Sequence, residues 1–178
     1  MEHCCKEMNY FRITKYNPKY RDDNGAYTLN DWTSIYDIGN YYNGMKLTNE
    51  KYQEIENLYV NAIILTINYL EILSMKIINL EVRDYDDNGL PFDEEMYNTF
   101  KSITDCDSIS IENIGNLVKM ILRENLWGKI VCDDLEIHFG YDYYMYFCVK
   151  EDISEKINEI EKMGLFVENI KSPHICDD

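Results

Sequence analysis

Residues 129–149 read KIVCDDLEIHFGYDYYMYFCV, and this stretch decides the fold that the sequence predicts. Apolar and polar residues alternate over 129–132 and over 135–139, a further strand-like run follows at 144–149, and short turns containing Asp or Gly separate the three runs. Such alternation between turn residues is typical of β-strands joined by tight connections. The stretch therefore predicts a three-stranded antiparallel meander.

Helical patterns lie on both sides of the meander. Upstream, Thr48 is suited to cap a long central helix, whose apolar residues recur at helical spacing: Tyr52, Ile55, Tyr59, Ile63, Ile67 and Leu70. A short helix near residues 96–103 and a longer one over 108–122 follow it. Downstream, residues 152–164 begin with a capping Asp and end with Gly, which predicts a further helix.

Several shorter elements complete the expected fold. Runs at 10–16, 75–82 and 165–170 have the composition of strands, and residues 30–38 have the pattern of a short capped helix. No repeat or linker divides the chain. The sequence therefore predicts one α+β domain over residues 1–178, with a mixed or mostly antiparallel sheet of about five to six strands and helices mainly on one face.

The chain is strongly acidic. Its 178 residues include 33 acidic and 17 basic side chains, which gives a formal net charge of −16. A negative field repels nucleic-acid phosphates and anionic membranes, and it speeds encounters with basic surfaces. The composition therefore argues against direct binding to nucleic acid or to a membrane, and it favours a basic protein partner.

The cysteines and the hydropathy pattern bear on location. Six cysteines show no Cys-x-x-Cys spacing, and they are Cys4, Cys5, Cys106, Cys132, Cys148 and Cys176. The first residues lack the charged and apolar regions of a signal peptide. No uncharged stretch reaches the ~20 apolar residues that span a bilayer. We therefore expect reduced thiols and a cytoplasmic protein.

The most acidic stretch is residues 84–95, DYDDNGLPFDEE, which matches the calcium-loop template at each constrained position. The ligands would be Asp84, Asp86, Asn88, the carbonyl of Leu90, and Glu95. Against a calcium site, Pro91 cannot donate the backbone hydrogen bond that pairs such loops, and no second loop is present. A calcium site and an ordinary acidic turn stay open as alternatives; the turn is favoured, and no other cofactor is expected.

Aromatic side chains interleaved with carboxylates form a second candidate surface. This mixture suits a cationic partner, because aromatic rings supply contact area and attract cations. The expected partner-binding residues are Trp32, Asp84, Asp86, Asp87, Tyr141, Asp142, Tyr143 and Tyr144.

A small enzyme or ligand-binding domain is the alternative reading. His138 lies in a predicted strand, and a pocket around it would be lined by Arg12, His138, Asp142 and Tyr144. However, the chain has no nucleophile elbow, no phosphate-binding glycine loop and no zinc-protease motif. The sequence therefore favours a protein without catalytic residues.

Two segments resemble a small family of uncharacterised proteins from low-GC bacteria. They are YFRITKYNP at residues 10–18, with DWTS and DIG after it, and HFGYDYYMY at residues 138–146. The resemblance implies no assigned activity, but short, acidic, aromatic-rich chains are similar to immunity proteins by analogy. We therefore expect an acidic protein-binding inhibitor, of immunity or antitoxin type, that occludes a basic nuclease or toxin. A nucleic-acid-mimicking anti-defence protein is a variant of this expectation.

Overall fold

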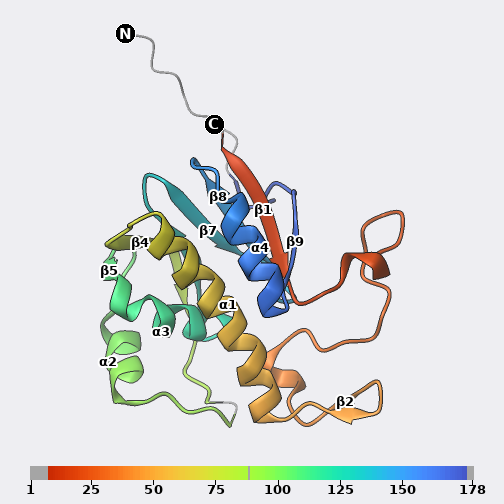
Figure 1. Cartoon of the computed structure of the whole chain (residues 1–178). Helices are drawn as coiled ribbons and strands as arrows, with labels where there is room; N and C mark the ends of the chain where they lie inside the picture. Colours follow the sequence, from red (N-terminus) through yellow and green to blue (C-terminus); the bar gives the residue numbers. More distant parts are fainter. Residues whose placement is uncertain (1–7, 88, 176–178) are drawn as a thin grey trace.

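The computed structural model describes residues 8–87 and 89–175, and its centre is a seven-stranded antiparallel sheet (Figure 1). The strands lie in the order β5, β4, β6, β7, β8, β1, β9. Their bounds are β1 Asn9–Thr14, β4 Ser74–Val82, β5 Ser108–Ser110, β6 Leu126–Val131, β7 Leu135–Phe139, β8 Met145–Val149 and β9 Phe166–Glu168. The α+β class and the meander over 129–149 are thus confirmed.

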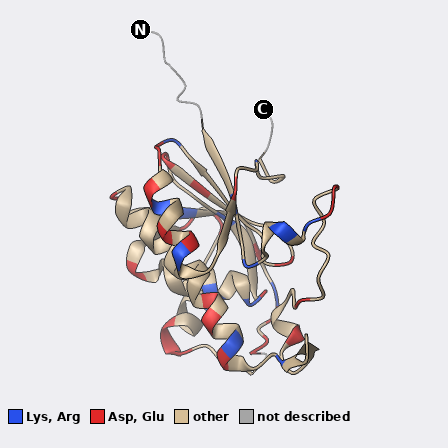
Figure 2. Cartoon of the chain, turned by 45° about the vertical axis from the view of Figure 1, so that its right-hand side comes forward, with Lys and Arg blue, Asp and Glu red and all other residues tan. Residues whose placement is uncertain are grey.

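Four α-helices are present in the described residues, and Figure 2 shows them gathered on one side of the sheet. They are α1 Asn49–Tyr69, α2 Glu94–Ser102, α3 Ile111–Leu122 and α4 Ser154–Met163. Thr48 caps α1 as expected, because its side chain accepts a hydrogen bond from the Lys51 amide. Within the described residues, no helix combines the length and the apolar character that a membrane crossing requires.

The two faces of the sheet differ in chemistry. One face carries a row of fully buried apolar side chains, in which Ile77, Ile130, Ile137 and Phe147 are neighbours on successive strands. Each such side chain contributes about 1.5–3 kcal/mol by leaving water. The opposite face carries a polar row across four strands, formed by His138, Tyr146, Arg12 and Glu168. Helices therefore cover the apolar face, whereas the polar face is covered in part by residues near the end of the described chain, such as Ser172 against His138 (Figure 2).

Several short elements differ from the prediction. Residues 108–110, expected as the start of a helix, form edge strand β5, so α3 begins only at Ile111. Residues 30–38 form no α-helix, and only a 3-10 helix, η2 Ile35–Asp37, is present there, capped by Ser34. A second 3-10 helix, η1 Pro18–Tyr20, and a small hairpin, β2 Tyr41–Tyr42 with β3 Met45–Lys46, were not predicted.

Candidate functional site

A pocket of about 310 Å³ lies at one end of the sheet, beside the turn that joins β7 to β8. Its lining is formed by residues 33–34, by Arg83, by five residues between 121 and 127, and by residues 139–144. We call it the hairpin pocket. It brings together four residues that the sequence predicts for partner binding, Tyr141, Asp142, Tyr143 and Tyr144.

The turn beside the pocket has an unusual backbone. The Tyr144 amide donates to the Tyr141 carbonyl at 3.2 Å, and the two residues between them have positive φ, 58° at Asp142 and 62° at Tyr143. This is the geometry of a type I′ hairpin turn, for which Asn-Gly is the preferred sequence. A tyrosine in this conformation costs free energy, on the order of 1–2 kcal/mol.

The buried side of the turn holds this conformation. The Tyr143 ring packs edge-on against Trp32 and Tyr59, with ring centroids 4.9 Å and 5.4 Å away. The Tyr143 carbonyl accepts a hydrogen bond from the Tyr59 hydroxyl at 2.7 Å. Core packing therefore compensates for the backbone strain and leaves Tyr141 and Asp142 exposed at the tip.

Backbone strain is concentrated around the hairpin pocket. Seven non-glycine residues of the described chain have positive φ, and three of them, Glu124, Asp142 and Tyr143, line this one pocket. Residues held in sparsely populated conformations gather at functional sites, where the surrounding structure fixes them. The strain thus marks the pocket as the leading candidate site.

The pocket wall combines rings, apolar side chains and carboxylates. Tyr141 is 84% exposed at the rim, whereas Leu126 and Phe139 are buried at the floor. The Glu124 carboxylate accepts from the Ser34 hydroxyl at 2.5 Å, and its other oxygen lies 3.4 Å from Arg83 Nη1. An amphipathic cation would find both an apolar and an anionic surface here.

The acidic stretch 84–95, which we call the acidic loop, begins beside the pocket. The Arg83 amide donates to the Asn125 carbonyl at 3.0 Å, and the Asn125 side chain donates to the Asp86 carbonyl at 3.0 Å. Asp84, Asp86 and Asp87 are all exposed. The loop and the aromatic turn, which are far apart in sequence, are therefore held close to one another through residues 124–125.

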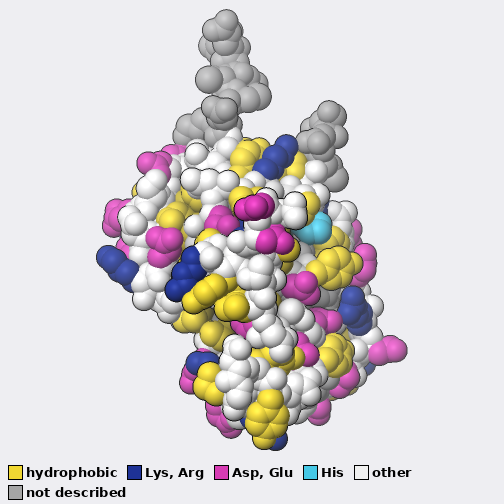
Figure 3. Space-filling model, turned by 90° about the vertical axis from the view of Figure 1, so that its right-hand side faces the viewer, with side chains coloured by type: hydrophobic (Ala, Val, Ile, Leu, Met, Phe, Trp, Pro, Cys, Tyr) yellow, Lys and Arg dark blue, Asp and Glu magenta, His cyan; other side chains and the backbone are white. Residues whose placement is uncertain are grey.

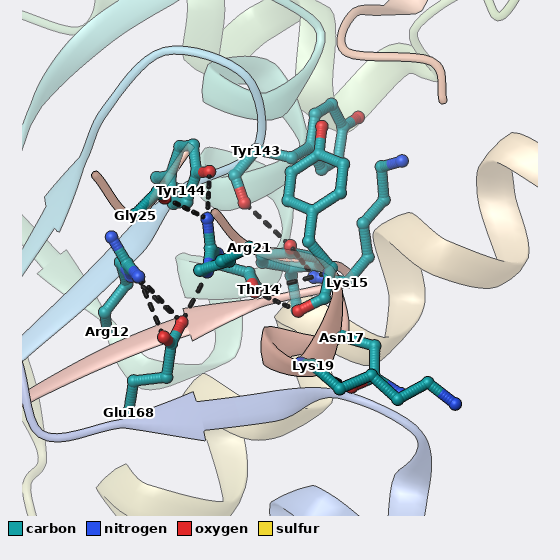
Figure 4. A network of polar contacts seen from close by, with 12 residues as sticks. Arg12, Thr14, Lys15, Asn17, Lys19, Arg21, Gly25, Tyr143, Tyr144 and Glu168 are labelled. Atoms are coloured by element: carbon teal, nitrogen blue, oxygen red, sulfur yellow. Dashed lines mark hydrogen bonds and ion pairs between the residues drawn. The ribbon is translucent and has the colours of Figure 1, made fainter. Parts of the chain in front are cut away.

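Tyr144 connects the pocket with the polar face of the sheet (Figure 4). Its hydroxyl accepts from Arg21 Nη1 at 2.8 Å, and Arg12 lies over its ring at 5.2 Å. Glu168 of β9 binds Arg12 through both carboxylate oxygens and pairs with Arg21 at 3.3 Å. This network fixes Tyr144, the last residue of the turn. Since Tyr144 lines the pocket, the network also positions that part of the pocket wall.

A second buried cation positions the opposite wall. Lys15 Nζ lies 2.8 Å from an Asp31 carboxylate oxygen and 4.1 Å from the centre of the Trp32 ring. Burial lowers the pKa of Lys15 to about 8, although Asp31 opposes this shift. The ion pair ties residues 31–34, which include pocket-lining Ser34, to the end of β1.

The structure changes the roles of several predicted residues. Trp32 and Tyr143 are only 6% exposed, so they pack within the pocket wall or against it and do not form the exposed surface that the sequence led us to expect. Tyr141 and Asp142 do lie on the surface. Most of the lining residues had no place in the predicted site, including Ser34, Arg83, Glu124 and Trp127. Of these, Arg83 has a signal in the sequence, since it is the one basic residue between Glu81 and Glu95.

The expected calcium ligands are not assembled in one shell. Asn88 lies outside the described residues, and the Leu90 carbonyl accepts a hydrogen bond from Arg123 Nη1 at 3.1 Å. The Leu90 carbonyl therefore already has a hydrogen-bond donor in the Arg123 guanidinium. Glu95 belongs to α2, and the described residues contain no group of three or more His, Cys, Asp or Glu side chains that could hold a metal ion.

The alternative pocket around His138 is closed. His138 is 1% exposed, its Nδ1 lies 2.8 Å from Ser172 Oγ, and its Nε2 lies 3.1 Å from Glu136 Oε2. These residue types could relay a proton, but Ser172 is also buried and its oxygen accepts from the His174 amide. Arg12 and Tyr144 lie together on another part of the sheet. The four residues expected around one pocket therefore do not share one.

No family model, no curated protein and no solved structure matches this chain. Its function must therefore be argued from its own geometry and charge.

Proposed function

We propose that the chain is an acidic protein-binding inhibitor, of immunity or antitoxin type, that covers the basic surface of a partner such as a nuclease toxin. The observation that carries the proposal is the hairpin pocket, where a strained aromatic turn, a fixed carboxylate and the start of the acidic loop come together. A partner side chain that enters this pocket would anchor the complex.

The charge distribution supports a two-part interaction. Figure 3 shows acidic side chains dispersed over one face among neutral and hydrophobic ones, without a single continuous patch. A dispersed field with a net charge of −16 attracts a basic partner from a distance but does not define where it docks. Specific contact must come from a shaped site, and the hairpin pocket is suited to that role.

Coexpression with the product of the neighbouring gene tests the proposal. We expect a stable complex and protection of growth if that product is a basic toxin. Tyr141→Ala should weaken the complex about tenfold or more, because an exposed aromatic anchor contributes on the order of 2 kcal/mol. Leu73→Ala is the matched control, since Leu73 is 83% exposed and precedes β4 at the opposite end of the sheet.

Two results would contradict the proposal. One is a complex that Tyr141→Ala and Leu73→Ala weaken equally. The other is the absence of any complex or protection, together with turnover of a small molecule by the purified protein, which would favour the enzyme alternative.

A further inference from the structure

We infer that the hairpin pocket is built for an arginine side chain of the partner, and that Arg83 is an internal guanidinium which the partner arginine displaces. This inference rests on the proposed function, in that it takes the pocket as the docking point. It adds the chemical identity of the occupant and a competitor within the chain itself.

Arg83 is weakly held. Its side chain is 55% exposed, and its ion pair with Glu124 has an N···O distance of 3.4 Å, long for a charged hydrogen bond. Exposed ion pairs of this kind contribute little to stability. A second guanidinium could therefore replace Arg83 at the Glu124 carboxylate at little cost.

Glu124, in contrast, is prepared for a cation. The Ser34 hydroxyl donates to one of its oxygens at 2.5 Å, and its backbone is fixed at φ 60° by the turn after α3. The Glu124 amide donates to the Ile121 carbonyl at 2.9 Å within that turn. The carboxylate is thus oriented before a ligand arrives, which lowers the entropy that binding must remove.

The remaining walls favour arginine over lysine. Trp127 and Tyr141 offer ring surfaces on which a planar guanidinium can stack, and Leu126 offers an apolar surface to the aliphatic stem. Lysine is a compact and strongly hydrated charge that neither stacks nor binds a carboxylate through two parallel hydrogen bonds. Asp142 adds a second carboxylate at the rim.

The pocket size limits the occupant. A volume of about 310 Å³ is at the small end of ligand pockets, which range over roughly 300–1,000 Å³. It suits a single inserted side chain better than a cofactor or a folded peptide. The geometry therefore assigns one arginine of a protein partner to this site.

The inference can be tested without the partner. N-acetyl-arginine amide is titrated into the isotope-labelled full-length protein, and the NMR signals of the Trp127 indole N–H and the 140–144 amides are followed. We expect saturable shifts with the arginine amide, binding about tenfold weaker with the lysine amide, and no shift with the citrulline amide, which is neutral and of similar shape. Shifts that are absent, or equal for the citrulline amide, would overturn the inference.

Variants of Arg83 and Glu124 test whether Arg83 competes with the added arginine for the Glu124 carboxylate. Arg83→Ala should tighten binding of the arginine amide by about twofold to fivefold, the range that an exposed ion pair supports. Glu124→Gln should weaken it by about tenfold or more, because a hydrogen bond to a charged group is lost. Glu155→Gln, at an exposed site on α4, is the control for charge alone. Unchanged or weaker binding by Arg83→Ala would contradict the role of Arg83.

Failure of this inference can be distinguished from failure of the proposed function. If the partner complex depends on Tyr141 but the protein does not bind the arginine amide, the arginine assignment is wrong and the proposed inhibitor function still stands. Arginine binding at the pocket, without any Tyr141-dependent partner complex, would keep the arginine site and remove the inhibitor. Thermal melting of each variant checks that its fold is retained.

Discussion

Among single residues, the pair formed by Glu56 and Arg123 ties together three segments of the chain. Both side chains are almost fully buried, and Arg123 Nε and Nη2 each donate to a different Glu56 oxygen at 2.8 Å. The remaining nitrogen binds the Leu90 carbonyl. One guanidinium therefore joins α1, the end of α3 and the acidic loop.

Loss of one partner from this pair should destabilise the fold strongly. Glu56→Gln leaves the Arg123 charge buried and uncompensated, so we expect the free energy of unfolding to fall by about 3 kcal/mol or more. Chemical denaturation measures the change. Glu54→Gln, on an exposed position of the same helix, should change it by less than about 0.5 kcal/mol. A loss below about 1 kcal/mol for Glu56→Gln would contradict this account of the pair.

At the scale of elements, residues 169–175 cover part of the polar sheet face. Ser172 binds His138, and the His174 carbonyl accepts from Lys129 Nζ at 2.5 Å. The His174 ring lies against Trp127 and Tyr146, with centroids 6.0 Å and 6.3 Å away. We call these residues the cover segment. It is held by two histidines and a buried lysine, with Glu136 as the one carboxylate bonded to His138.

Acid should loosen the cover segment. Burial lowers the pKa of His138 below its ordinary value of 6.5, and the Lys129 charge lowers it further, while Glu136 opposes both effects. Burial and Lys129 also lower the pKa of His174. An open segment therefore takes up protons more readily than a closed one, so closure is fully stable above pH 6.5 and is weakened as the pH falls below it.

Hydrogen exchange measures this effect. After correction for the intrinsic pH dependence, the amides of residues 170–175 should exchange faster at pH 5 than at pH 7.5, while those of β7 and β8 stay protected. His138→Gln retains a donor and an acceptor but does not titrate, so it should reduce the difference. A difference of equal size in that variant would show that His138 is not the sensor.

The acidic loop should not respond to calcium. The Leu90 carbonyl, one of the expected ligands, already accepts a hydrogen bond from the Arg123 guanidinium, which disfavours its use by an ion. Saturating calcium at a true site would stabilise the protein by about 2.7 kcal/mol at a concentration of 100 Kd. We instead expect millimolar calcium to change Tm by less than about 1 °C. A rise of several degrees that Glu95→Gln abolishes would establish the site.

The sequence predicted the long elements because their patterns are local. Alternation over 129–149 and helical spacing after Thr48 are each visible within one segment. Strand β5 and helix η2 have three residues each, and β5 exists through its pairing with β4, which no local pattern reveals.

The site was predicted only in part for the same reason. Tyr141 and Asp142 stood out within one aromatic segment. The positions of Ser34 and Glu124 beside them follow from tertiary contacts alone.

For the whole molecule, the proposed function assigns the association rate of a partner to the net charge and the lifetime of the complex to the hairpin pocket. The two effects can be separated by varying the salt concentration, because exposed charges are screened over a Debye length of about 8 Å at physiological salt. Salt should change the association rate, whereas a buried anchor should mainly set the dissociation rate. The acidic loop belongs to the first effect and Tyr141 to the second.

Neutralising the loop should slow association. Replacement of Asp84, Asp86 and Asp87 by Asn should lower the association rate with a basic partner by about threefold or more at low salt, with less effect at high salt. Stopped-flow mixing measures the rate. The control removes three other exposed charges, by Glu54→Gln, Glu155→Gln and Glu161→Gln. Equal slowing by both triple variants would mean that only net charge steers the partner.

Site-specific photocrosslinking in the native cell tests the central claim, that the hairpin pocket docks a basic protein. A photoreactive phenylalanine analogue replaces Tyr141 in one strain and Leu73 in another, since both are more than 80% exposed. The account predicts one major adduct with a basic protein from position 141, which Glu124→Gln diminishes, and none from position 73. Adducts that are absent at 141, that form equally at both positions, or that contain only acidic proteins would contradict it.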